Sequence, residues 1–204
     1  GITMQEYLSA ERKPFLTEKL SDKSAVKVFF TGRLVYYKGA DVLLKAFRRV
    51  KNCELFIAGT GVLEQQLKDY ARAKGLDGKV HFLGFLPDEQ LKQSYADCDI
   101  FVLPSTVKSE AFGIVQLEAM VYGKPVINTN LASGVPCVSL DGVTGITVPP
   151  GDEKALAAAI NKLAQDSALR GEYGRNAEKR VREQFSEENV IKRLYSVLTE
   201  GVNI

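Results

Sequence analysis

The sequence predicts an α/β fold, a doubly wound parallel sheet of about six strands with helices on both faces and extra helices at the C-terminal end. From residue 26 onward, short apolar runs alternate with segments of helical periodicity, the pattern of repeated strand–helix units. After Pro149-Pro150-Gly151 the strand-like runs stop and helical patterns alone follow. Together these observations favour one sheet that is complete before the last helices begin.

Strands are expected where an apolar run is short, and the helices between them where the pattern is bounded by Gly, Pro or Asp. The expected strands span residues 26–30, 55–58, 80–83, 100–103, 125–128 and 145–148. Helices are expected over residues 40–50, 62–74, 88–96 and 111–122. The later helices are expected over residues 153–164, capped by Asp152, over residues 168–184, and from the N-cap Ser186 onward.

The start of the chain differs from the rest. Residues 1–24 contain no strand-like run, and residues compatible with a helix are mixed with lysines, so we expect a connecting arm. Residues 25–204 are expected to form the domain itself. Because a doubly wound sheet begins so abruptly here, the arm would arrive from a preceding domain of a longer protein.

The composition is that of an ordinary globular protein, with 45% apolar and 25% charged residues. The net charge of +2 is small and basic residues are interspersed with acids, so nothing indicates nucleic-acid binding. The sequence has neither an apolar run of eighteen residues nor a signal pattern, which predicts a cytoplasmic chain. Cys53, Cys98 and Cys137 are expected to be free thiols, buried as small apolar side chains.

Two carboxylates, Glu110 and Glu118, stand in a segment that is otherwise almost entirely apolar. A helix that is apolar all round belongs in the interior, where an ionised Glu118 needs a partner. At the helical rise the two acids would lie ~12 Å apart. This exceeds the ~6.5–9.5 Å of an inverting glycosidase pair, so one long ligand is favoured over hydrolysis of one bond. Alternatively, backbone amides satisfy a structural Glu118 and Glu110 is a helix N-terminal acid.

Two cations and a glycine-rich turn follow the first two expected strands. Arg33 and Lys38 lie at the carboxyl end of a strand, where open α/β sheets bind ligands. The Arg fork and the Lys point charge suit a diphosphate, although such cations are more often solvated than functional. Gly59-Thr60-Gly61 would let the backbone approach a nucleotide. Glu64 replaces the third glycine of a dinucleotide fingerprint, which disfavours a nicotinamide or flavin enzyme.

A metal site is not expected. Asp97-Cys98-Asp99 has the form of a metal-binding pair of acids, yet it lies where a helix passes into a buried strand, and helix termination explains it better. His81 is the single histidine and lies in an expected strand, facing the core or the sheet surface. It leaves no second histidine for a metal site or a Ser-His triad.

Taken in order, these motifs resemble the donor-binding half of a retaining glycosyltransferase of family 4. The resemblance is carried by Gly32-Arg33, Lys38-Gly39, Gly59-Thr60-Gly61, Phe82-Leu83-Gly84, the segment from Ser109 through Ala119 and the text of residues 142–152. Such enzymes have the GT-B architecture of two facing Rossmann-like domains. The chain would then be the C-terminal domain, without the N-terminal acceptor domain.

The resemblance also implies roles for individual residues. Glu110 would contact the transferred sugar, while Arg33 and Lys38 would stabilise the diphosphate, and these three form the implied catalytic set. Glu118 would hold the ribose hydroxyls. The other implied donor-binding residues are Phe112, Gly113, Ile114 and Val115 through their amides, Gly59 and Gly61 in a supporting turn, and Gly84, Phe85 and Leu86 beside the base, with residues 133–136 bordering the site.

The implied donor is a UDP- or GDP-hexose, used as a substrate without a metal or other cofactor. Transfer would proceed on one face of the sugar with retention, and the leaving phosphate would accept the acceptor proton. The acceptor would be a glycan or glycolipid of polysaccharide or lipopolysaccharide assembly, and the full-length protein would associate peripherally with the inner membrane face. Cys137 departs from the pattern, since similar bacterial enzymes often carry tryptophan there. The alternatives are a nucleotide-sugar binding module without transfer and a GT-B phosphorylase or epimerase.

Overall fold

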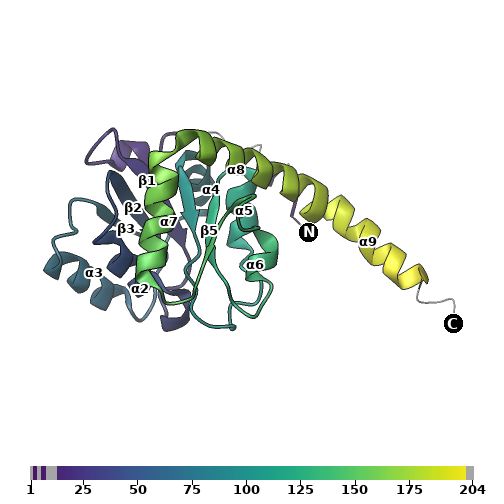
Figure 1. Ribbon diagram of the computed structural model, residues 1–204, viewed down its shortest axis with the longest axis horizontal. Helices are drawn as coiled ribbons and strands as arrows, with labels where there is room; N and C mark the ends of the chain where they lie inside the picture. The colour runs from purple at the N-terminus through teal and green to yellow at the C-terminus, as the bar shows by residue number, and fades with distance from the viewer. Residues whose placement is uncertain (1, 4–5, 8–12, 201–204) are drawn as a thin grey trace.

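The computed structural model describes residues 2–3, 6–7 and 13–200, which form a sheet between helices with one long helix projecting from the body (Figure 1). The strands are β1 (Val26–Thr31), β2 (Cys53–Ala58), β3 (Val80–Gly84), β4 (Ile100–Val102), β5 (Val126–Thr129) and β6 (Gly145–Val148). They pair in parallel in the order β3-β2-β1-β4-β5-β6. The predicted doubly wound sheet is confirmed, and its topological switch point lies between β1 and β4.

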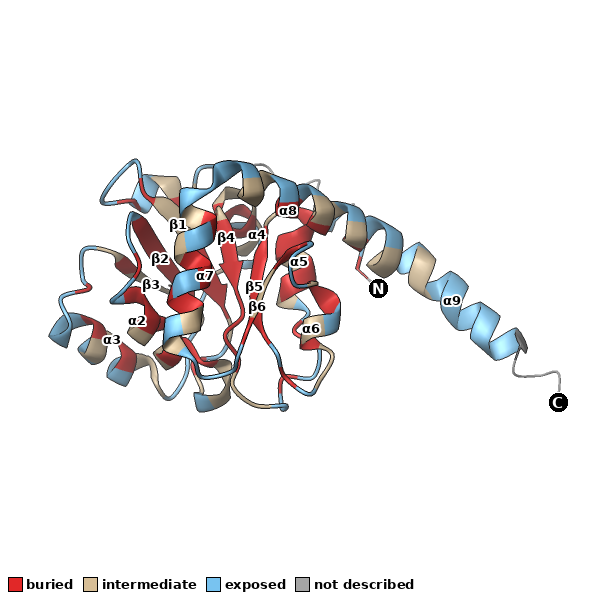
Figure 2. Ribbon diagram, viewed as in Figure 1, coloured by how far each residue is buried: buried red, intermediate tan, exposed pale blue. Residues whose placement is uncertain are grey.

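Helices cover both faces of the sheet. On one face lie α2 (Ala40–Phe47), α3 (Glu64–Ala73) and α7 (Glu153–Gln165), and on the other α4 (Asp88–Asp97), α5 (Val115–Val121) and α6 (Val135–Val138). In β1, Val28 and Phe30 pack under α2, α3 and α7, while Phe29 packs on the opposite face under α4, α5 and α6. All three side chains are fully buried. Figure 2 shows the strands as a buried layer. Burial on both faces explains why the central strands are nearly continuous apolar runs in the sequence.

The expected helix over residues 111–122 is shorter than predicted, because α5 begins only at Val115. The cause is Gly113, whose φ of 67° is left-handed. A Cβ at this position would also lie 2.4 Å from the Leu103 side chain. Glu110 therefore lies in a loop rather than at a helix N-terminus, and the helical rise does not measure the distance between the two acids.

Helices alone follow the sheet, as predicted. They are α7, then α8 (Ser167–Arg180), the π-helical turn η3 (Val181–Phe185) and α9 (Glu187–Glu200). In Figures 1 and 2, α9 extends away from the body, and its side chains over residues 191–199 are exposed. Within the described residues, every helix is too short or too polar to cross a membrane.

Asp97 fastens the arm to the end of α4. Its Oδ2 accepts the N–H groups of Leu16 and Thr17, each at 2.7 Å, while its Oδ1 accepts the Thr17 hydroxyl at 2.8 Å and lies 3.1 Å from the Lys27 ammonium. Burial acts to raise the pKa of Asp97, but hydrogen bonds from Thr17 and Lys27 outweigh it and lower the pKa. Because Asp99 accepts the Lys27 N–H at 2.7 Å, both acids of Asp97-Cys98-Asp99 have structural partners.

Glu54, in β2, fixes the arm at a second point. Its side chain is nearly fully buried and accepts the N–H of Ser21 at 3.0 Å and that of Asp22 at 2.6 Å. Its Oε2 also lies 2.5 Å from His81 Nε2. The imidazole of His81 stacks on Phe56 with ring centroids 4.7 Å apart. His81 is therefore a strand-face residue, one of the two positions that the sequence allows, and Glu54 is its structural partner.

Candidate functional site

The loops after β1 and β2 pack against each other at the carboxyl edge of the sheet. A Cβ on Gly59 would lie 2.0 Å from the Gly32 carbonyl oxygen, and one on Gly61 would lie 2.4 Å from that of Leu34. The Leu34 N–H donates to the Thr60 carbonyl at 2.9 Å. Both glycines thus have a packing role, since any larger residue would separate the two loops.

Lys38 and Glu110 form a buried ion pair beside the switch point. Lys38 ends η2 (Tyr36–Lys38) after β1, and Glu110 lies in the loop after β4. The Lys38 Nζ is 2.5 Å from Glu110 Oε2, and the side chains are 14% and 10% exposed. The Ser105 hydroxyl donates to the same oxygen at 3.0 Å. Such a pair is neutral as a unit, but removal of one partner leaves an uncompensated buried charge.

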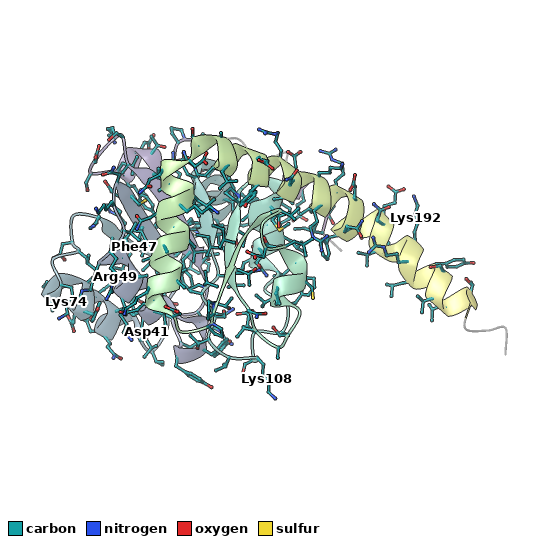
Figure 3. All side chains as sticks on the ribbon, in the orientation of Figure 1. Asp41, Phe47, Arg49, Lys74, Lys108 and Lys192 are labelled. Carbon is teal, nitrogen blue, oxygen red and sulfur yellow. The ribbon has the colours of Figure 1, made fainter. Side chains whose placement is uncertain are left out.

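Backbone contacts hold the loops that carry this pair. Gly39 has a φ of 71°, and a Cβ there would lie 2.0 Å from the Pro104 carbonyl oxygen. The Thr106 N–H donates to the Tyr37 carbonyl at 2.8 Å. Lys108, in the same loop as Thr106, points away from the body (Figure 3). The close approach of these loops is what brings Lys38 to an acid far away in the sequence.

Arg33, the other predicted cation of the β1 loop, lies at the surface. Its Nη2 donates to the Tyr37 hydroxyl at 3.0 Å. The Tyr37 ring meets Tyr36 edge to face, with centroids 5.6 Å apart. The Lys38 ammonium lies 5.6 Å from the centroid of the same Tyr37 ring, so both predicted cations meet Tyr37 and differ in exposure, Lys38 being largely buried and Arg33 at the surface.

Glu118, in α5, accepts hydrogen bonds from two tyrosines. Tyr7 of the arm donates to Oε1 at 3.0 Å, and Tyr95 of α4 donates to Oε2 at 2.5 Å. The carboxylate thus has the partner that its apolar surroundings require, but the donors are phenols rather than the backbone amides of the structural alternative. Burial and the Glu118 charge raise the pKa of both Tyr7 and Tyr95, so both hydroxyls stay protonated and donate.

The segment between the two acids is held from the other side by α6 and β5. The Gly134 N–H donates to the Ala111 carbonyl at 2.7 Å. Gln116 Nε2 donates to the Phe112 carbonyl at 3.1 Å, and Gln116 Oε1 accepts from Asn128 Nδ2 at 2.9 Å. This buried amide network fixes the backbone over residues 111–116, including the amides to which the family resemblance gives a role in donor binding.

An apolar groove of about 420 Å³ runs beside this segment, between the start of α5 and α9. Its lining includes Phe112 and Ile114, both exposed, together with Leu117, Phe185 and Leu194. The predicted site residues Phe112 and Ile114 therefore present their side chains to this groove. Val115, the first residue of α5, is half-buried.

The turn predicted to flank the base lies next to the β2 loop. Gly84 has a φ of 65°, and its carbonyl accepts the Gly59 N–H at 2.7 Å. Phe85 is 79% exposed. With Leu86 and Lys19, Phe85 lines a cleft of about 610 Å³. An exposed aromatic ring at the edge of the site is available to contact a flat ligand group.

Sequence reasoning missed Tyr7, Tyr95 and Ser105. A signal existed for Tyr95. A tyrosine near the end of a helix that packs on the sheet needs a partner for its hydroxyl, and Glu118 needed a hydrogen-bond donor, so the two could have been paired. Ser105 lies five residues before Glu110 in the loop that follows β4, and this loop position was a weaker signal. No local pattern indicates Tyr7, since its contact depends on the path of the arm.

The three cysteines are free thiols, but the expectation that all are buried is wrong for Cys137, which is exposed. It follows Pro136 in the short helix α6, whose apolar residues Val135 and Val138 face the core instead. Cys53 and Cys98 are buried, and burial raises the pKa of each thiol to about 12. Neither buried thiol is a nucleophile at neutral pH.

Comparison with protein families gives a match over most of the chain. The family described as glycosyl transferases group 1 matches residues 12–180. The O-antigen chain mannosyltransferase C of Escherichia coli is 35% identical over 175 residues, which are 84% of this chain and 47% of that protein. The D-rhamnosyltransferase WbpZ of Pseudomonas aeruginosa is 40% identical over 161 residues, 77% of this chain and 41% of that protein. The chain thus spans somewhat less than half the length of these curated relatives.

Among solved structures, the fold matches Anabaena Alr3699/HepE in complex with UDP, with a TM-score of 0.86 and 26% identity. This match covers 98% of the present chain and 56% of that chain. The same protein in complex with UDP-glucose gives a TM-score of 0.85 and 25% identity over the same shares of the two chains.

Proposed function

We propose that this chain, which belongs to the glycosyl transferases of group 1, binds the nucleotide-sugar donor of a hexosyl transfer. The observation that carries the proposal is the buried Lys38–Glu110 pair at the switch point, where doubly wound sheets bind ligands. UDP and UDP-glucose in the complexes of the similarly folded HepE support it. A second acid, Glu118, extends the site along α5.

The proposed architecture follows the family resemblance. Residues 1–24 are the connecting arm and residues 25–204 the donor domain of a GT-B protein whose acceptor domain precedes it. The enzyme is a retaining glycosyltransferase of family 4. Its donor is a UDP- or GDP-hexose, and neither a metal nor another cofactor takes part.

At the diphosphate, Lys38 and Arg33 supply positive charge. Negative charge builds on the diphosphate as the glycosidic bond breaks, and cations placed in advance stabilise it without reorganisation. Glu110 contacts the sugar while keeping Lys38 in position, and the amides of residues 112–115 add donors. The departing phosphate accepts the proton of the acceptor hydroxyl. A glycosyl ester trapped on Glu110 would contradict this order of events.

At the nucleoside, the carboxylate of Glu118 accepts hydrogen bonds from the ribose hydroxyls. Gly84, Phe85 and Leu86 flank the base, and Gly59 and Gly61 keep the adjoining loops close enough to support both groups. The acceptor is a glycan or glycolipid of polysaccharide or lipopolysaccharide assembly. The full-length protein works in the cytoplasm, at the inner face of the membrane.

Calorimetric titration of the chain with UDP, GDP, ADP and their common sugar conjugates tests the site. We expect saturable binding of one nucleotide, weakened at least about tenfold in Glu118→Gln, because hydrogen bonds to a charged group contribute about 1.5–3 kcal/mol each. Glu172→Gln, an exposed acid on α8, is the matched control and should bind like the parent. A folded chain that binds none of these ligands, or that binds equally well without the Glu118 carboxylate, would overturn the proposal.

The two alternatives predict different reactions of the longer protein. A binding module would bind the donor without transferring its sugar to any acceptor. A phosphorylase would break a glycoside only with phosphate, and an epimerase would isomerise the donor sugar without an acceptor. Assays of donor consumption with acceptor, with phosphate and with neither separate these reactions.

A further inference from the structure

Glu118 is held in a way that leaves part of its hydrogen-bonding capacity open. Among the described residues, each oxygen accepts one phenol, Tyr7 on Oε1 and Tyr95 on Oε2. An ionised carboxylate has about four lone-pair sites, so about two remain. A vicinal diol, as in ribose, offers two donors. The number of open sites therefore matches the number of hydroxyls that the proposed function assigns to this residue.

The two phenols differ in how they are fixed. Tyr95 is fully buried within the core between α4 and the sheet. Its ring meets Phe29 edge to face, with centroids 5.4 Å apart, and lies 5.6 Å from the ring of Phe101. Tyr95 is therefore a rigid donor on one oxygen of Glu118.

Tyr7 comes from the arm and is held by contacts that do not involve Glu118. Its carbonyl accepts the Tyr122 hydroxyl at 2.6 Å, and its ring meets the Tyr122 ring edge to face at 6.4 Å. The Lys92 ammonium lies 5.4 Å from the centroid of the Tyr7 ring. These contacts place the phenol oxygen of Tyr7 independently of the bond that it donates.

A carboxylate at the end of a glutamate rotates easily, because its last torsion joins sp³ to sp² carbon and has broad minima. One donor fixes one oxygen but leaves the plane of the group free. Two donors on different oxygens, each anchored on its own element, also fix the plane. The bond from Tyr7 therefore limits the direction in which the open lone pairs of Glu118 point.

We propose that Tyr7 is a positioning residue for donor binding, which acts with Tyr95 to orient the Glu118 carboxylate toward the ribose diol. The inference rests on the proposed function, since it deepens the role of Glu118 there. It makes the arm part of the donor site, although the arm lies outside the sheet loops that form the rest. Discrimination between ribose and deoxyribose then depends on Tyr7, which lies 111 positions away in the sequence from Glu118, the acid that binds the ribose.

Tyr7→Phe tests this inference, because it removes the hydroxyl and keeps the ring that contacts Tyr122 and Lys92. The probes are the nucleoside diphosphate that binds the parent chain and its 2′-deoxy and 3′-deoxy forms, each titrated calorimetrically. We expect the ribonucleotide to bind about fivefold more weakly and the deoxy forms to change by less than about twofold, so the preference for ribose shrinks. Tyr70→Phe, on the remote helix α3, is the matched control and should keep both affinities.

The Glu118→Gln background makes the test specific. If Tyr7 acts through the carboxylate, Tyr7→Phe should have no further effect on ribonucleotide binding once the carboxylate is gone. Equal weakening of ribose and deoxyribose ligands would indicate a general structural role and overturn the inference. Unchanged binding would overturn it too, and tighter binding would show that Tyr7 competes with the ligand.

The two proposals fail in different ways. If Glu118→Gln weakens binding and Tyr7→Phe changes neither affinity nor ribose preference, the positioning role is wrong and the donor site stands. If Glu118→Gln itself has no effect, the donor-site assignment of Glu118 is wrong and the positioning role falls with it. A urea unfolding curve of each variant confirms that the compared chains are folded.

Discussion

Replacing Lys38 by methionine should lower the free energy of unfolding by about 3 kcal/mol. The ammonium lies 2.5 Å from Glu110 Oε2, and both side chains are largely shielded from water, so solvent screening is small. Methionine keeps the apolar stem and leaves Glu110 as a buried anion. Loss of one member of such a pair costs about 3–5 kcal/mol, and the lower end applies because the Ser105 hydroxyl still donates to the carboxylate.

Urea unfolding followed by circular dichroism measures this change. The double variant Lys38→Met/Glu110→Gln removes both charges and should lose only about 1 kcal/mol, since no buried charge is left unpaired. Lys45→Met is the matched control in α2, where Lys45 pairs with Asp41 at 2.8 Å with both side chains about two-fifths exposed. Its loss should stay below about 1 kcal/mol. Equal losses for Lys38→Met and Lys45→Met would refute the reasoning that burial makes the first pair matter.

Two further changes test the loop and the arm. Gly113→Ala should lower the free energy of unfolding by about 2 kcal/mol or more, because of its positive φ and the contact of the new Cβ with Leu103. The control Gly142→Ala, with a φ of 70° and open space around it, should lose about 1 kcal/mol in urea unfolding. Equal losses would show that the contact with Leu103 contributes nothing. The pKa of Asp97 is lowered in the folded state, so its contribution to the free energy of unfolding is fully present above about pH 4 and is lost as the pH falls through its native pKa. The stability difference between parent and Asp97→Asn should therefore shrink below about pH 4, and a difference constant from pH 7 to 2 would contradict the assignment.

The strands could be predicted from the sequence within a few residues, most directly in the centre of the sheet, where β1, β2, β4 and β5 are buried on both faces. In β1 every position from Val28 to Thr31 is buried, so the run is apolar without alternation, and glycine or proline follows most runs closely. The start of α5 could not be predicted in the same way. Residues 111–114 are apolar apart from a glycine, and hydrophobic periodicity does not reveal that Gly113 has a left-handed φ.

The candidate site was predicted in outline but not in its pairings. The strand pattern places Lys38 and Glu110 after β1 and β4, and ligands of doubly wound sheets bind at the carboxyl ends of strands, so both residues were candidates. Their direct contact depends on the Gly39–Pro104 approach, which is a tertiary feature. The need of Glu118 for a partner was predicted from its apolar neighbours. The identity of that partner was not, because Tyr7 reaches it through the arm.

The pairing of Lys38 with Glu110 also limits the distance over which the charge of Lys38 acts on its surroundings. An ammonium and a carboxylate 2.5 Å apart form a dipole, whose field falls off more steeply than that of a single charge. At physiological ionic strength the remainder is screened within about 8 Å. The buried part of the site therefore does little to steer an anion from solution. In the proposed site, Lys38 therefore acts on an anion only after contact, and the surface guanidinium of Arg33 is better placed to act during the encounter.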